Sequence, residues 1–231
     1  MSRPSAASLA QRLLAGEPAT VHGDDTAAIA ELLKAEADRQ ISIDSQRSLE
    51  IAELICALPA DPAVRALGVL TRADALRQLG RYAEAAHAYQ QAADLFRAVD
   101  DDVGWARTRS GAALVTRYTG GHALVLEQLD QARSIFGQRG LWLRLSRLEQ
   151  NAGGFLAALG RADDALAAHE RALAAAERLD PRSELLEAEV WGNLSLAYYR
   201  VDDHERANAF LARAVAVFER EGQHEFVARA E

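Results

Sequence analysis

The chain repeats itself about every 40 residues. Three segments align without gaps, and their glycines, Gly80, Gly120 and Gly160, lie 40 residues apart. An alanine stands twelve residues beyond each of these glycines. A fourth copy surrounds Asp202 after two extra residues, and a degenerate earlier copy fits Gln40. A fixed period of this length predicts an array of stacked structural units, because each unit alone is too small to bury a core.

Each copy has the features of a helical hairpin. Glycine at the end of a first helix can adopt the left-handed conformation that closes a helix. Small residues after the turn, such as Ala85 and Ala165, let a second helix approach the first closely. Large apolar residues then recur at helical spacing. The chain is 49% hydrophobic and rich in strong helix formers, so we predict an all-α fold.

Start signals and the repeat register set the expected boundaries. Asp61-Pro62 and Asp180-Pro181 each place an acidic N-cap before a first-turn proline. A short helix near residues 5–15 and a linker make up region 1–23, and the array covers 24–231. We expect hairpins at about 24–58, 62–99, 103–137, 141–179 and 183–221.

The end of the chain looks like the start of a sixth repeat, broken off after residue 222. Residues 225–229 match 103–107, which open a first helix. This match favours a fragment of a longer protein, with more repeats or an effector domain following. The alternative is a frayed end that simply stops.

Composition argues against several classes of function. The net charge of −8 disfavours nucleic-acid binding, which needs clustered basic residues. Cys56 is the only cysteine, so an internal disulfide or a cysteine zinc site is excluded, and its register predicts a buried apolar position. We find no secretory signal and no apolar run of the ~20 residues that cross a bilayer, which predicts a cytoplasmic protein without membrane contact. No phosphate loop, metal-ligand pair or catalytic constellation occurs, so we expect neither a cofactor nor an enzyme.

Two motifs resemble the tetratricopeptide repeat family. The segment Trp191–Tyr198 is close to the family's first-helix signature, and Leu79–Ala86 is close to its turn and second helix. The resemblance covers about residues 24–231 and implies a right-handed α-solenoid of about five antiparallel helical hairpins. The period exceeds the family's usual 34, as in arrays similar to those of bacterial CHAT-protease and large transcriptional-activator signalling proteins.

The resemblance implies a scaffold or sensor that binds a protein or a peptide within a larger bacterial signalling protein. One alternative is the regulatory N-terminal region of a caspase-like CHAT protease, whose catalytic domain lies outside this chain. Another is a peptide-sensing transcription regulator, but the first 60 residues show no helix-turn-helix and no basic character.

First helices line the concave face of such arrays, where ligands usually lie. Transferring the register gives a candidate ligand-binding groove formed by Arg107, Arg117, Tyr118, Arg147, Asn151, Asn193, Tyr199 and Arg200. Asn151 and Asn193 occupy equivalent positions, where the resemblance implies that an asparagine grips the backbone of an extended peptide. The alternative role is solubility or a contact between repeats.

The arginines of this groove predict an acidic peptide or a C-terminal carboxylate as ligand, because guanidinium groups grip carboxylates in a bidentate fork. The alternative is that they are solvated and pair with Asp74, Glu149 and Glu189.

Several glycines fall within the predicted first helices. We expect Gly153 to allow close helix packing. Gly154, with Gly111 and Gly192, suggests a concave face kept open for the backbone of a ligand or for tight curvature.

Overall fold

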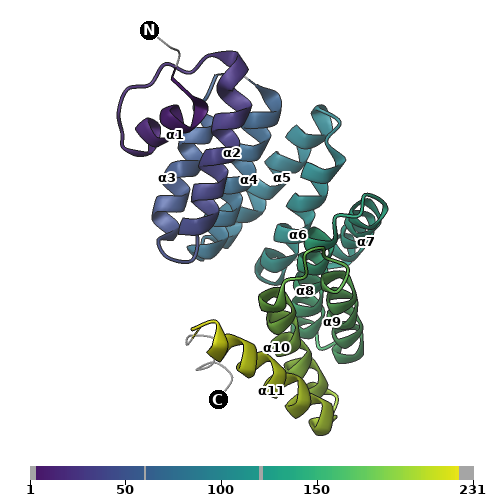
Figure 1. Ribbon diagram of the computed structural model, residues 1–231. Helices are drawn as coiled ribbons and strands as arrows, with labels where there is room; N and C mark the ends of the chain where they lie inside the picture. Colours follow the sequence, from purple (N-terminus) through teal and green to yellow (C-terminus); the bar gives the residue numbers. More distant parts are fainter. Residues whose placement is uncertain (1–3, 60, 120–121, 224–231) are drawn as a thin grey trace. The chain divides into compact units, whose positions relative to one another are not determined.

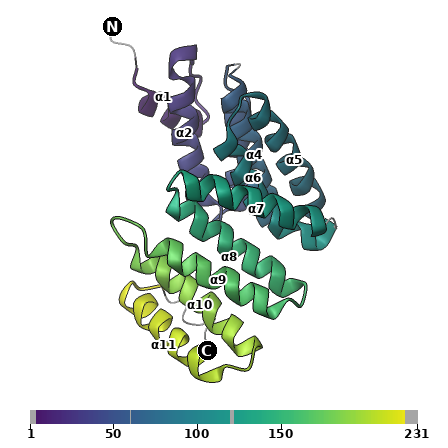
Figure 2. The same cartoon turned by 90° about the vertical axis from the view of Figure 1, so that its right-hand side faces the viewer.

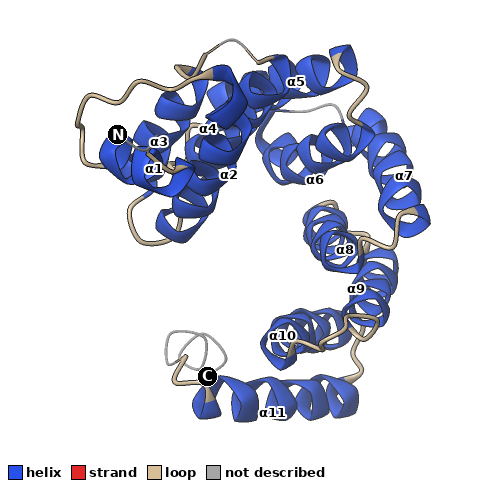
Figure 3. Ribbon diagram, turned by 45° about the horizontal axis from the view of Figure 1, so that its top comes forward, coloured by secondary structure: helices blue, strands red, loops and turns tan. Residues whose placement is uncertain are grey.

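The structure is a computed structural model that describes residues 4–59, 61–119 and 122–223. These residues form eleven helices and no strands, which confirms the all-α prediction (Figure 3). None of the described helices is long and apolar enough to span a membrane. The predicted sixth repeat at 225–229 lies outside the described residues.

Within each of two compact units, consecutive helices pack against one another as in a tetratricopeptide-type solenoid, and each predicted hairpin corresponds to two helices (Figure 1). The helices are α1 (Ala6–Leu14), α2 (Gly23–Gln40), α3 (Ser45–Cys56), α4 (Pro62–Gln78), α5 (Tyr82–Ala98), α6 (Asp102–Thr119), α7 (His122–Gln138), α8 (Trp142–Ala158), α9 (Ala162–Ala176), α10 (Glu184–Arg200) and α11 (His204–Arg220). The chain divides into two compact units, Met1–Val125 and Leu126–Glu231, which we describe separately.

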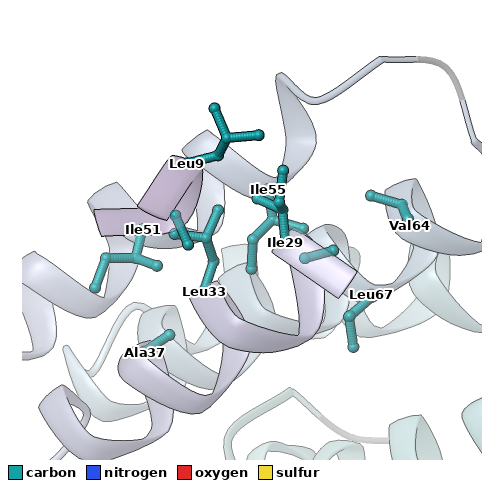
Figure 4. Close-up of a cluster of buried hydrophobic side chains, with 10 residues drawn as sticks. Leu9, Ile29, Leu33, Ala37, Ile51, Ile55, Val64 and Leu67 are labelled. Atoms are coloured by element: carbon teal, nitrogen blue, oxygen red, sulfur yellow. The ribbon is translucent and has the colours of Figure 1, made fainter. Parts of the chain in front are cut away.

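The core of the first unit joins its first four helices (Figure 4). Leu9 of α1 packs with Leu33 of α2, Ile55 of α3 and Leu67 of α4. These side chains come from helices that are too short to bury an apolar stripe alone, so the unit is stable only as a stack.

The core of the second unit lies between its last helices. Trp191, Leu194 and Tyr198 of α10 pack with Val217 and Phe218 of α11. Figure 2 shows α8 to α11 following one another in chain order, and each packs on the next. Consequently the first helices α8 and α10 are close neighbours.

The turns within the hairpins follow the repeat alignment. Gly80 and Gly160 both have a φ of +74°, and Asp202 takes the same left-handed role with a φ of +61°. Asp is one of the few residues with a side chain that tolerates this conformation. Gly120 lies outside the described residues.

Only one of the two predicted Asp-Pro caps forms. Asp61 caps α4, since its carboxylate accepts hydrogen bonds from the backbone N–H groups of Ala63 and Val64 at 2.8 and 3.3 Å. The prediction for Asp180 is wrong, because α10 begins later and Ser183 is its N-cap, accepting from Leu186 at 3.3 Å. An Asp-Pro pair therefore marks a helix start only where the residues that follow the proline are themselves helical, as they are after Pro62 and not after Pro181.

This difference gives a direct test. Asp61→Ala is expected to lower the free energy of unfolding by about 1 kcal/mol, because two backbone donors lose their acceptor. Asp180→Ala should leave it unchanged. Urea denaturation measures both, and equal losses for the two variants would contradict the assignment of the caps.

Candidate functional site

Polar contacts link the first helices α8 and α10 at successive levels. Arg147 forms an ion pair with Glu189. One level along, Asn193 Nδ2 donates a hydrogen bond to Gln150 Oε1 at 3.1 Å. At the far end, the Arg200 guanidinium approaches a backbone carbonyl of α8 at 3.5 Å. We call this surface the α8–α10 face and define it by Arg147, Gln150, Asn151, Gly154, Glu189, Gly192, Asn193, Leu196, Tyr199 and Arg200.

The middle of the α8–α10 face is open and partly apolar. A Cβ atom added to Gly154 or to Gly192 would meet nothing within 4 Å. Leu196 and Tyr199, one helical turn apart on α10, are 55% and 62% exposed. Two large exposed apolar side chains beside two bare glycines form a surface that a ligand can cover.

The polar groups of this face are already engaged with one another. Arg147 pairs with Glu189, as the alternative reading of the arginines anticipated. Asn193 makes a contact between repeats, although the carbonyl oxygen of its amide accepts no hydrogen bond in this contact. Gln150 Nε2 is buried and has no hydrogen-bond partner. Asn151 is half-buried. A peptide-binding role for these residues therefore stays a prediction.

The remaining predicted groove residues belong to the first unit. Arg107 is half-buried, and the side chain of Arg117 lies outside the described residues. Tyr118 is 50% exposed and stacks on Tyr82, with ring centroids 3.8 Å apart and planes at 2°. The predicted residues therefore belong to two different units, and their role as one groove stays a prediction.

The glycines have different roles from one another. The reading of Gly111 as part of an open face is wrong, because an added Cβ would lie 2.5 Å from the ring of Tyr89. Tyr89 is fully buried and its hydroxyl donates to Asp74 Oδ1 at 2.7 Å, so the ring cannot easily move.

Gly153 packs as predicted, since a Cβ atom added to it would lie 2.5 Å from the ring of His169. Burial, with a smaller effect of the Arg200 charge, lowers the pKa of His169 to about 4, so this ring is neutral at pH 7.

Glu149 differs from its predicted role as a partner for groove arginines. Its carboxylate is 1% exposed and binds Arg133 of α7 and Arg171 of α9 instead. Repeat register placed Glu149 on a first helix but could not show which arginines would reach it. Glu149 therefore links three consecutive helices and contributes to packing rather than to a ligand site.

Cys56 is half-buried rather than buried as predicted, because it lies at the edge of a cavity beside α4. Among the described residues, no group of three or more His, Cys, Asp or Glu side chains could hold a metal ion.

The comparisons with known proteins agree with this architecture. Residues 144–220 match the family model of the tetratricopeptide repeat. The matched residues lie in α8 to α11. No curated protein matches the sequence.

Solved structures share the fold at low sequence identity. BtubC (BKLC) from P. vanneervenii is 20% identical, with a TM-score of 0.68 over 92% of this chain and 87% of that one. A signal transduction ATPase with numerous domains from Pyrococcus horikoshii, which has a tetratricopeptide repeat sensor, is 16% identical with a TM-score of 0.72. The match covers 96% of this chain and 33% of that protein. A Rap protein complexed with competence and sporulation factor is 17% identical, with a TM-score of 0.65 over 91% of this chain and 64% of that one.

Proposed function

We propose that this chain is a scaffold or sensor module without catalytic activity, and that its α8–α10 face binds a protein or peptide. The observation that carries the proposal is the open strip at Gly154 and Gly192 beside the exposed Leu196 and Tyr199. Two proteins of the same fold support it. One has a tetratricopeptide repeat sensor, and the other is a Rap protein complexed with competence and sporulation factor.

The proposal extends to a place within a larger cytoplasmic signalling protein with an attached effector domain. The signal transduction ATPase supports this, because the fold of this chain matches one third of that protein.

The chemistry of the face favours an extended ligand with one apolar and one acidic group. An apolar side chain would cover Leu196 and Tyr199, and the bare Gly154 would let a backbone approach α8 closely. The Arg147 charge is neutralised by Glu189, so Arg200 is the better site for a carboxylate. Asn193 would accept a hydrogen bond from the ligand backbone through its amide oxygen.

A library of short peptides, scored by fluorescence polarisation, tests this proposal. Peptides that bind should share an apolar residue near an acidic residue or a free carboxylate. Leu196→Asp and Arg200→Glu are each expected to weaken the best peptide about tenfold or more, because they remove an apolar contact and a counter-charge. Asn193→Ala should weaken it less, since one hydrogen bond is lost.

The control is Leu32→Asp, at an apolar position of α2 that is 42% exposed and lies in the first unit. It should leave binding unchanged. Circular dichroism checks that each variant stays helical. Unaltered binding in both Leu196→Asp and Arg200→Glu, with helicity retained, would rule out the α8–α10 face as the binding surface.

A further inference from the structure

The first unit has an open groove along α4, with α3 and α5 as its walls. Two cavities of about 490 and 780 Å³ lie in it, one toward each end of α4, and Arg72 lines both. We call this surface the α3–α5 groove. Its defining residues are Cys56 on α3, Val69, Arg72 and Leu76 on α4, and Ala88 and Gln91 on α5.

The last hairpin carries large side chains at the equivalent positions. Asp202 stands where Gly80 stands in the second hairpin, so equivalent residues differ by 122 in number. By this register Val69 corresponds to Trp191, Leu76 to Tyr198, Ala88 to Phe210 and Gln91 to Arg213.

These large side chains pack with one another. The rings of Tyr198 and Phe210 stack with centroids 5.6 Å apart and planes at 4°. The Arg213 guanidinium lies 4.0 Å from the centroid of the Trp191 ring. The space that is open beside α4 is thus filled beside α10 by aromatic rings and one cation.

We propose that the α3–α5 groove binds a helix of a partner protein that carries two aromatic residues seven positions apart. Val69 and Leu76 on the groove floor have this spacing, and so have Trp191 and Tyr198. Seven residues of a helix span about 10.5 Å, or two turns, so a helix along α4 would present one ring to each cavity.

Arg72 supplies the matching cation. Its guanidinium donates to Gln91 Oε1 at 3.0 Å and lies 3.8 Å from Glu53, which holds it between the two cavities. A ring entering either cavity would meet this guanidinium, as Trp191 meets Arg213. The surface lies on α3, α4 and α5, so it is separate from the α8–α10 face and can be tested independently.

The single cysteine of the chain reports on this groove. Cys56 lines the larger cavity and is half-buried, so an occupant should shield it from alkylation. Burial raises the pKa of the Cys56 thiol, and the reaction with iodoacetamide is therefore followed at about pH 8.5, where more thiolate is present.

The probe is a synthetic helical peptide with Trp and Tyr seven positions apart. At ten times its Kd it is expected to slow alkylation of Cys56 about tenfold, because about one tenth of the groove remains free. A peptide with both aromatic residues replaced by alanine should not slow the reaction.

A matched pair of variants locates the effect. Gln91→Trp places a ring in the groove from an exposed wall position and should abolish protection by the peptide. Gln131→Trp, at the exposed equivalent position on α7, should retain it. The proposal is overturned if the aromatic peptide gives no protection, if the alanine peptide protects equally, or if Gln91→Trp is protected like the unaltered chain.

Discussion

Replacing Glu149 by glutamine is expected to lower the free energy of unfolding by about 2–3 kcal/mol. The carboxylate is almost completely buried and accepts hydrogen bonds from Arg171 Nε at 3.0 Å and Arg133 Nη2 at 3.3 Å. Glutamine keeps the shape but turns an amide N–H donor toward guanidinium donors. Both arginines are partly exposed, so water can solvate their guanidinium groups in the variant. The loss of stability is therefore smaller than for a fully buried ion pair.

Asp130→Asn provides the control for Glu149→Gln. Asp130 pairs with the same Arg133, but its side chain is 71% exposed. An exposed pair one turn apart contributes less than about 1 kcal/mol, so this change should be small. Urea denaturation gives both values, and the account fails if the two variants lose the same stability.

Two adjacent glycines of α8 are expected to respond to alanine in opposite directions. Gly153→Ala should lower the free energy of unfolding by about 1–3 kcal/mol, because the new methyl group would overlap the buried ring of His169. Gly154→Ala should raise it by about 0.5–1 kcal/mol, because the methyl group meets nothing within 4 Å and alanine costs less backbone entropy in a helix.

Thermal or urea unfolding of the two single variants measures this contrast. Each variant serves as the control for the other, since both add one methyl group to the same helix. Changes of the same sign would contradict the described packing between α8 and α9.

Sequence reasoning was most accurate where the controlling interactions are local. The hairpin turns carry a glycine, or Asp202 in the last hairpin, because the chain takes a left-handed backbone conformation there. This conformation depends on few neighbouring residues, so the sequence can predict it. The cap at Asp180 failed for the opposite reason. Whether a helix starts at a given proline depends on how the following residues pack, and there Ser183 became the cap.

For the candidate site, the register placed residues on the correct helices without showing their partners. It put Asn193 on a first helix, and the structure shows that its amide donates to Gln150. The repeat register assigned Gly111 and Gly154 to the same open face. In the structure the ring of Tyr89 packs against Gly111, whereas nothing packs against Gly154. Such differences depend on side chains from other helices, which a repeat alignment does not contain.

The sequence by itself determined the helical repeat, the position of most turns and the class of fold, because these follow from periodicity and backbone conformation that every repeat encodes again. Tertiary structure decided which space between the repeats is filled and which stays open. The α3–α5 groove is open because Val69 and Ala88 are small, whereas Trp191 and Phe210 fill the equivalent space in the last hairpin. Close packing between helices depends on the volumes of several side chains at once, so the surfaces available to a partner emerge only when the hairpins are stacked.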